Sequence, residues 1–441
     1  MRMMFALPVA LLLAATACKF PYPPDVVDDG GTVDGTSATC TPDTTTCADG
    51  TLTVCDSHGA PTSTTPCTFG CAPAGDRCGD LAPSNGLAMY LDQARTASPV
   101  VLTGDAVIDT DAPRVTVNGT PVPVQTAVVS SAPVDILVII AKSFEVDNAV
   151  ARGHRALAIV SDGDVLIHGT LSVSAAREVP GAGAAAANDP ACTARNGVAA
   201  VGGTGGAGGG GHGTAGGRGG SGGTSQGGTA GAVVGVDTLL PLRGGCPGAD
   251  AFAVPSAREE DEHPGGGGGA IQITSRARIL LDAGAGITAS GGGAKGDTEG
   301  PITPFCTDQV GAPPTCNVGA GGGAGGGILL EAAEVVVPAS SKVVANGGAG
   351  HCGYAGYAAD GTDSESAAPG SDCSMLGNTG SGGNGGAGGS PGFNGTNGTQ
   401  VGGGGGGGAG RIRINLPVDV VFDPGPPIIS PPPSLGNAAT R

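Results

Sequence analysis

The chain has 441 residues, a formal charge of −18, 87 glycines and no tryptophan, and 13% of its residues are charged. Its glycine share is roughly three times the usual ~7%, and its charged share is about half the usual ~25%. The acidity disfavours nucleic acid and anionic lipid headgroups as electrostatic partners. With aromatic residues at 3%, the composition favours a thin aliphatic core over a large two-layer enzyme domain.

The first 17 residues predict an export signal. Arg2 precedes an apolar run from Phe5 to Leu13, and small residues follow that run. The apolar run is too short for a permanent membrane-spanning helix. We therefore expect residues 1–17 to be a signal peptide that is removed on export.

A cysteine follows the signal directly. Ala15 and Ala17 fit signal peptidase cleavage, and together with Cys18 they also resemble a bacterial lipobox, although lipoproteins most often have leucine at the position of Ala15. Residues 18–39 are rich in Pro, Asp and Gly and have no apolar period, which predicts a disordered tether. We expect Cys18 to be lipidated and to anchor the protein to a membrane. Free secretion is the alternative.

Residues 40–80 predict a small disulfide module. An exported segment this short cannot bury a sufficient core, so its cysteines are expected to form three bridges of undetermined connectivity. These cysteines are Cys40, Cys47, Cys55, Cys67, Cys71 and Cys78. Zinc is the weaker alternative, because no CxxC pair occurs and an oxidising compartment disfavours free thiolates.

Short aliphatic segments recur between the glycine runs of the following region. Each copy has three segments whose first apolar residues are about eight positions apart. The three segments of the first copy begin at Leu157, Val165 and Val173, and those of the second at Ile271, Ile279 and Ile287. Those of the third begin at Ile328, Val335 and Val343, and those of the fourth at Ile412, Val420 and Ile428. A turn of about 24 residues with three strands is typical of a parallel β-helix. We predict an all-β fold with a right-handed parallel β-helix over residues 85–430. A β-sandwich is the alternative, because its strands also recur at intervals of 8–12 residues.

The segments alternate along their length. Residues such as Ile271 and Ile273 are expected to point inward, whereas Gln272, Arg411 and Arg413 point outward toward solvent. Several prolines follow Val420, so the last copy is expected to be distorted and to end in a Pro-rich tail over residues 431–441.

Gly-rich insertions separate the copies, at about residues 177–265, 291–327 and 346–408. Proline is scarce in the longest glycine run and no strict Gly-X-Y repeat occurs, so a collagen helix is not expected. Closely packed extended chains of the polyproline II type and flexible loops both remain open. Each insertion contains two cysteines, which predicts a bridge within each. The pairs are Cys192 with Cys246, Cys306 with Cys316, and Cys352 with Cys373.

The sequence predicts no catalytic residues, no cofactor and no metal centre. Two GxSxG matches lack the strand-to-helix context of a nucleophile elbow. Alternating oxygens at Asp360, Asp363 and Glu365 form only a weak candidate for calcium. The outward carboxylates of the predicted helix, which a carbohydrate-active β-helix enzyme would use, form no convincing pair. They are Asp164, Asp282, Glu331 and Glu334.

The lipobox, acidic tether, Cys-rich module and glycine-flanked segments together resemble glycine-rich surface lipoproteins of Gram-negative bacteria, and the glycine pairs are similar to PGRS-type domains. This resemblance implies a location and a shape. We expect a non-enzymatic lipoprotein of the outer membrane or cell surface with a structural, adhesion or matrix role. Its expected partners are the membrane, through the lipid, and surface glycans or other envelope proteins. The alternatives are a β-helix lyase or glycoside hydrolase, and a stalk that presents the Cys-rich module.

Overall fold

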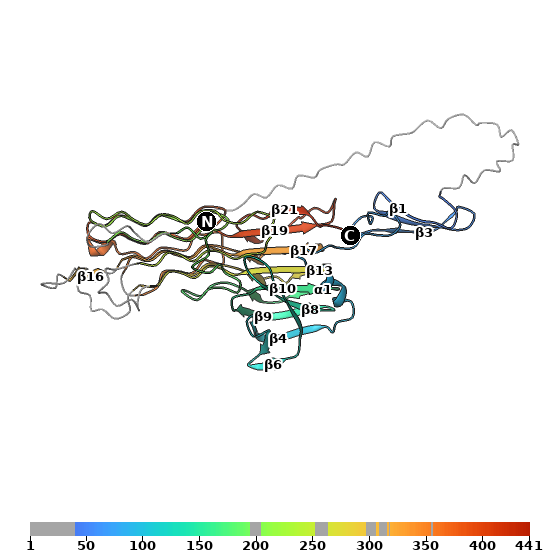
Figure 1. The fold of residues 1–441 in the computed structure, drawn as a ribbon, viewed down its shortest axis with the longest axis horizontal. Helices are drawn as coiled ribbons and strands as arrows, with labels where there is room; N and C mark the ends of the chain where they lie inside the picture. Colours follow the sequence, from blue (N-terminus) through green and yellow to red (C-terminus); the bar gives the residue numbers. More distant parts are fainter. Residues whose placement is uncertain are drawn as a thin grey trace, which may run out of the picture.

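The computed structural model describes residues 40–194, 204–251, 263–296, 306–307, 315–316, 318–353 and 356–441. These residues are mostly in strands and irregular runs, with one short α-helix, α1 (Ala88–Ala94), and a single 3₁₀ turn, η1 (Ser374–Leu376). The all-β prediction is confirmed at this level. The molecule is elongated: a disulfide module lies at one end, stacked strands lie in the middle, and glycine-rich runs form the other end (Figure 1). The predicted signal peptide, Cys18 and tether lie outside the described residues.

The module at the first end is a three-stranded antiparallel sheet of β1 (Thr45–Ala48), β2 (Thr51–Cys55) and β3 (Pro61–Pro66). Disulfides join Cys40 to Cys55, Cys47 to Cys71 and Cys67 to Cys78. Every residue of β3 is exposed, so the sheet covers little apolar surface. The bridges therefore supply the stability that the core cannot, at about 2–4 kcal/mol each.

The first of three strand series consists of β8 (Ile136–Ala141), β10 (Ala156–Ser161), β13 (Ala270–Leu281), β17 (Gly327–Val336) and β19 (Arg411–Leu416), paired in parallel. Leu157 lies opposite Ile271, Ile271 opposite Ile328, and Ile328 opposite Ile412. The predicted first positions of the four copies are thus in register. Leu137 precedes them as a further copy that the eight-residue spacing does not reveal.

The second series pairs β9 (Phe144–Arg152), β11 (Val165–Ile167) and the C-terminal half of β13, which aligns with that of β17. Val165, Ile279 and Val335 are in register, as predicted. Val420 is not part of this series: no strand includes it, and it is 41% exposed. The expectation of a strand at Val420 was wrong because prolines interrupt the segment that follows β19.

The third series consists of β12 (Thr170–Ser172), β14 (Gly286–Thr288), β18 (Lys342–Val344) and β20 (Ile428–Ser430). Ile287 and Val343 align as predicted. In the outer copies the predicted register is wrong: Leu171 rather than Val173 lies opposite Ile287, and Ile429 rather than Ile428 lies opposite Val343. The turns before these strands differ in length, so a constant step of eight does not hold there.

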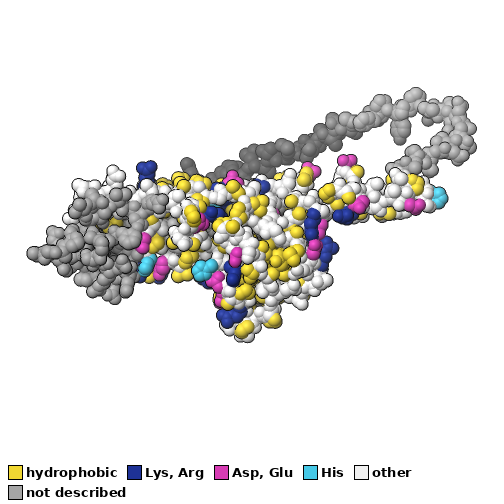
Figure 2. Space-filling view, in the orientation of Figure 1, with side chains coloured by type: hydrophobic (Ala, Val, Ile, Leu, Met, Phe, Trp, Pro, Cys, Tyr) yellow, Lys and Arg dark blue, Asp and Glu magenta, His cyan; other side chains and the backbone are white. Residues whose placement is uncertain are grey.

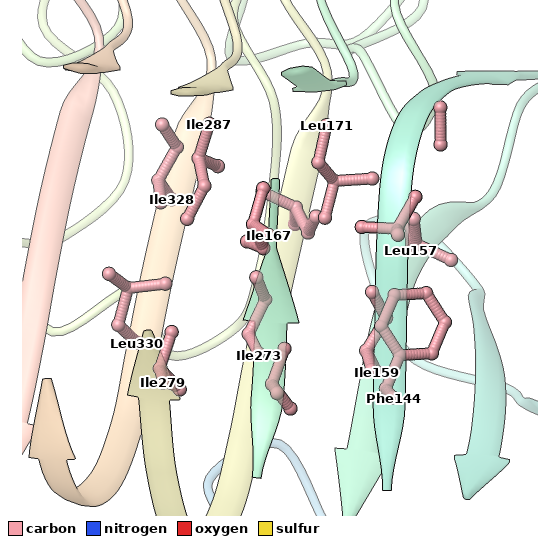
Figure 3. Close-up of a cluster of buried hydrophobic side chains, with 14 of the residues drawn as sticks. Phe144, Leu157, Ile159, Ile167, Leu171, Ile273, Ile279, Ile287, Ile328 and Leu330 are labelled. Atoms are coloured by element: carbon pink, nitrogen blue, oxygen red, sulfur yellow. The ribbon is translucent and has the colours of Figure 1, made fainter. Parts of the chain in front are cut away.

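The inward side chains of all three series meet in one aliphatic core. Figure 3 shows Leu157, Ile273, Ile279, Ile287 and Leu330 directed into the same interior from neighbouring strands. Each is fully buried or nearly so. Each such side chain contributes roughly 1.5–3 kcal/mol of transfer free energy. We call these three parallel series, with their common core, the stack.

Antiparallel strands cover the first edge of the stack. One is β7 (Gln125–Val129), which pairs with β8. The others form a meander of β4 (Val100–Asp109), β5 (Arg114–Val117) and β6 (Thr120–Val122). In addition, β4 pairs in parallel with β9. At the other edge β21 (Ser434–Asn437) pairs with β19. The expectation that residues 431–441 are only a tail was wrong: Ile414 lies opposite Leu435, and the last residues bond to the segment before α1.

The glycine-rich insertions are ordered where the structure describes them. The clearest case is the run 402–410, whose successive N–H groups donate in three directions with a period of three residues. Gly405 donates to Ala207, Gly406 to Phe393 and Gly407 to Gly348, at 2.8–2.9 Å between nitrogen and oxygen. Their carbonyls accept in turn from Gly322, Gly217 and Gly386. One run therefore bonds to six neighbours. Three residues per turn is the period of polyproline II.

Glycine is required by this packing. A Cβ on Gly406 would lie 1.9 Å from the backbone oxygen of Asn384, and one on Gly407 would lie 1.9 Å from that of Gly323. Neighbouring backbones fill the space that a side chain needs. In the parts of the insertions that the structure describes, the extended, closely packed alternative therefore holds and the flexible-loop alternative does not. We call the runs 204–210, 217–220, 319–325, 348–351, 383–386, 393–396 and 402–410 the glycine bundle.

Disulfides close within the glycine-rich insertions, as predicted from the sequence order of the cysteines. Cys192 is bonded to Cys246 and Cys352 to Cys373. The backbones of Cys306 and Cys316 lie opposite each other in a short antiparallel pair of β15 (Cys306–Thr307) and β16 (Thr315–Cys316). The side chains of this last pair lie outside the described residues.

Candidate functional sites

The carboxylate of Glu331 is buried in a polar network. Its side chain is on the outer face of β17, as the alternation predicts, but the residue is 1% exposed because the segment before α1 covers it. Ser84 donates through its hydroxyl at 2.6 Å, Gln272 through its amide at 2.8 Å and Asn415 through its amide at 3.0 Å. Gln272, expected to face solvent, is 0% exposed for the same reason. A carboxylate with this many donors is a structural anchor with little capacity left for a substrate.

A second network fixes α1 and the C-terminus to the stack. The Arg276 guanidinium donates to Asp80 at 2.7 Å, and to Asp92 and Asp162 at 2.9 Å. Arg441 also donates to Asp80 and Asp92. Burial raises the pKa of Asp80, but the hydrogen bond and charge of Arg276 outweigh it and hold that pKa below its usual value. No sequence pattern indicates that these distant segments meet, because the partners of Arg276 come from residues 80, 92 and 162.

The remaining outward carboxylates are engaged by basic partners. Asp282 lies 2.6 Å from Nδ1 of His168, whose Nε2 lies 3.1 Å from Glu145. The hydrogen bond with Asp282 raises the pKa of His168, and Glu145 adds to this effect. Asp164 accepts from Arg278 at 2.6 Å, and Glu334 lies near the same arginine. The four predicted carboxylates therefore lie in three separate ionic or polar networks.

The weak calcium candidates also have other roles. Asp360 accepts hydrogen bonds from the backbone N–H groups of Arg177 and Gly293, and Asp363 pairs with Lys342. Within the described ranges, no group of three or more His, Cys, Asp or Glu side chains is arranged to hold a metal ion. The structure brings Asp360, Asp363 and Glu365 to one loop without assembling them into a coordination site.

Two histidines are buried within the glycine-rich region. His212 lies in the interior with its Nδ1 at 3.0 Å from the Gly325 carbonyl. Burial, reinforced by the charges of Arg411 and Arg243, lowers its pKa to about 3. Burial alone lowers the pKa of His351 to about 4. Both rings are therefore neutral at physiological pH and act as packing groups there.

A cleft of about 1180 Å³ lies where the glycine-rich insertions leave the stack. Its walls are mainly proline and alanine: Pro133, Pro180, Ala184, Ala185, Ala186, Ala187, Pro190, Pro247 and Pro264. Its ionisable lining residues are Asp111, Asp135, His154, Arg155, Glu178, Asp189, His263 and Lys295. A concave, mostly apolar site with a few polar groups is the usual form of a ligand-binding site.

Most of these polar groups have partners. His154 donates its backbone N–H to Asp111 at 2.9 Å, and its Nδ1 lies 2.8 Å from the same carboxylate. Arg155 donates to the carbonyls of Thr110 and Asp111, and Asp189 pairs with Arg243 at 2.9 Å. Glu178 differs, because its Oε2 is buried and accepts no hydrogen bond from any described residue. No sequence motif indicates this cleft, since its walls come from segments far apart in the chain.

Charged side chains elsewhere are dispersed. Figure 2 shows them as small separate groups among hydrophobic and uncharged residues on the face in view. Among the described residues, no helix is both long enough and apolar enough to cross a membrane.

No protein-family model, no curated protein and no solved structure matches this chain.

Proposed function

We propose that this protein is an exported lipoprotein of the outer membrane or cell surface of a Gram-negative bacterium, with a non-enzymatic adhesion or matrix role. The proposal combines the export signal and Cys18 with the disulfides, which form and persist in oxidising compartments. In this role, the lipid and the tether hold the protein at the membrane while the elongated body extends from it.

We further propose that the stack is a right-handed parallel β-helix. In support, three parallel strand series share one core, and the chain visits them in order from β10 through β11 to β12, then through β13 to β14. Right-handed crossovers are strongly preferred between parallel strands. Each glycine-rich insertion leaves after the third series and returns before the first, at one corner of the helix.

The observation that carries the functional proposal is the glycine bundle. A run bonded to six neighbours has few ways to bend without breaking several hydrogen bonds together. The bundle is continuous with the stack, because the run 402–410 passes directly into β19 and the run 319–325 leads into β17. A rigid extension of this kind suits a protein that holds a contact surface away from a membrane.

Anchoring is tested in a Gram-negative host that expresses the full chain. The wild-type protein is expected to fractionate with membranes, to carry acyl groups on Cys18 by mass spectrometry, and to be accessible to antibody on intact cells. Cys18→Ala is expected to be released in soluble form with its disulfides intact. Wild-type protein that is unacylated and soluble would overturn the lipoprotein proposal. Acylated protein that stays inaccessible on intact cells would overturn the surface role.

A further inference from the structure

We propose that the open edge of β21 binds a short extended peptide segment in which aliphatic residues alternate with a single carboxylate. The proposal rests on the proposed function, because it assigns the contact surface through which an adhesion protein would recognise a partner. β21 and β19 lie at one edge of the stack, and β6 lies at the opposite one (Figure 1). Three features of the β21 edge point to such a partner: its unpaired backbone, a pocket beside it and the guanidinium of Arg413.

β21 offers backbone hydrogen-bonding groups to a further strand. Among the described strands it pairs only with β19, and there the Ala438 N–H donates to the Leu416 carbonyl. Backbone groups alternate in direction along a strand, so those of Leu435 and Asn437 point to the open side. Both of these residues are exposed. An open edge of this kind is where an extended peptide adds as a further strand.

A pocket next to β21 fits one aliphatic side chain. Its volume is about 210 Å³, and Leu435 lines it together with side chains of β19 and of the loop that follows: Ile414, Leu416, Val420 and Phe422. Leu435 lies opposite Ile414, whose side chain belongs to the core, so this is the inner face of the edge. No further coil among the described residues covers this face, and Leu435 is 55% exposed. An aliphatic side chain of an added strand would remove this apolar surface from water.

Arg413 places a cation on the other face of the same edge. Its Nη1 donates to the Leu435 carbonyl at 2.8 Å and its Nε donates to Asn415 at 2.7 Å, so the guanidinium reaches across to β21. A Cβ on Gly436 would overlap Nη2, because the guanidinium crosses the strand at this glycine. Gly436 lies opposite Asn415, on the face away from the side chain of Leu435.

The charge of Arg413 has no direct counterpart. Its guanidinium donates to neutral acceptors, and no carboxylate of the described residues lies at ion-pair distance from it. Glu331 attracts it from farther away, but that carboxylate is buried and has donors of its own. Partial burial lowers the pKa of Arg413, because its charged form loses water. A ligand carboxylate that accepts from Nη2 would offset this loss with a charge-assisted hydrogen bond.

These features together define the pattern of the partner. Side chains alternate between the two faces of a strand, so a residue that covers Leu435 is followed by one that faces Arg413. The chain carries −18, and Asp419 and Asp423 belong to the loop beside the pocket, so a single carboxylate suits the edge better than an acidic run. The prolines at 431–433 precede β21 and confine the added strand to its length of four residues.

The test compares two capped pentapeptides by calorimetric titration of the full chain. One is threonine–valine–aspartate–valine–threonine, and the other has asparagine in place of aspartate, so the two share a shape and differ by one charge. The aspartate peptide is expected to bind with a dissociation constant of about 1 mM, and the asparagine peptide about tenfold more weakly, as one charge-assisted contact implies. Equal affinities, or no binding of the aspartate peptide up to about 10 mM, would overturn the proposal.

Arg413→Gln removes the cation and keeps a donor at the edge. It is expected to weaken the aspartate peptide about tenfold and to leave the asparagine peptide unchanged. Arg114→Gln removes one exposed cation at the opposite edge of the stack and is the matched control, with no change expected. Equal losses in both variants would show that only the overall charge matters, and would overturn the assignment of Arg413. Thermal melting confirms that each variant is folded.

Leu435→Ser removes the aliphatic surface of the inner face and is expected to weaken both peptides about fivefold. Unchanged affinities would contradict binding at β21. Sedimentation of the unliganded chain tests a second copy as the occupant, and a monomer is expected. A dimer that Leu435→Ser dissociates would assign the edge to a second copy and overturn the peptide proposal. Membrane anchoring and surface exposure are measured separately, so failure of the edge proposal is distinguishable from failure of the proposed function.

Discussion

The stack and the glycine bundle stabilise neighbouring parts of one chain by different means. In the stack the backbone bonds to strands on either side, and the side chains of residues such as Ile279 and Leu157 fill the space between the sheets. In the bundle the backbone bonds in three directions, and at Gly406 there is no room for a side chain. The first region excludes water with aliphatic groups, whereas the second does so with the main chain itself.

The difference has an energetic consequence. Burial of an aliphatic side chain contributes roughly 1.5–3 kcal/mol, whereas a backbone hydrogen bond contributes a net ~0.5–1.5 kcal/mol. Glycine also loses more conformational entropy on folding than any other residue. The bundle is therefore expected to be the weaker region on its own. Its runs are held by the strands that they join, and by the bridges Cys192–Cys246 and Cys352–Cys373.

The stack should be the more sensitive region to a charged substitution. Ile279→Asp places a carboxylate at a site that is 0% exposed and has no basic partner in the core, so the expected loss exceeds ~4 kcal/mol of unfolding free energy. Thermal melting measures it. Val101→Asp, at a residue that is 52% exposed, is the control and should cost below about 1 kcal/mol. Unchanged melting of Ile279→Asp would place this residue outside the core.

Removal of a bridge should loosen the bundle while leaving the stack folded. Replacing both Cys192 and Cys246 by serine opens a loop with a sequence separation of 54, for an expected loss of about 2–4 kcal/mol. Amide exchange should quicken in the run 204–210 and stay unchanged in β10. Equal losses of protection in both regions would mean that bundle and stack unfold as one unit.

Adding a single methyl group should discriminate the two packing modes. Gly406→Ala forces the backbone of Asn384 to move, at a cost of ~1–3 kcal/mol. Gly425→Ala is the matched control, because its Cβ would meet only Ala339 N at 3.5 Å, an ordinary contact. Equal melting temperatures for the two variants would contradict close packing around Gly406.

Acid should weaken the bundle before the stack. The folded pKa values of His212 and His351, about 3 and about 4, lie below the ordinary 6.5, so the unfolded chain binds protons more tightly. Their contribution to the free energy of unfolding is complete above pH 6.5. It is lost as the pH falls toward 4 for His351 and toward 3 for His212, at up to ~1.4 kcal/mol per pH unit for each histidine. His351→Asn, which can still accept from the Gly353 N–H, should reduce this slope. An unchanged slope would show that His351 does not titrate in this way.

Much of the stack could be predicted because its pattern is local. The alternation of apolar and polar residues around Ile271, and the recurrence of this pattern at Ile328 and Ile412, indicate which positions face inward. The parallel register of the strands follows from it. The predictions failed where turn lengths vary, as at Val173 and Ile428. They failed again where a distant segment covers an outer face, as at Gln272 and Glu331. Neither the length of a turn nor the burial of an outer face by a distant segment can be predicted from the periodicity of the sequence.

The bundle and the cleft were less accessible to prediction. A glycine run has no side-chain pattern, so its sequence is equally compatible with flexible loops and with packed chains. The decision depends on which runs meet, such as 402–410 with 204–210 and 319–325. The cleft likewise has no distinguishing sequence context, because its walls come from segments that are brought together only in the folded chain.

The most direct measurement is residue-resolved amide hydrogen exchange of the native protein at neutral pH. An ordered bundle predicts slow exchange for every residue from Gly402 to Gly408, because each N–H is bonded to a neighbouring run. Protection should extend to the bonded runs 204–210, 319–325 and 348–351. Exchange at the rate of an unstructured peptide in these runs, with β10 and β13 still protected, would contradict the bundle and return the insertions to flexible loops.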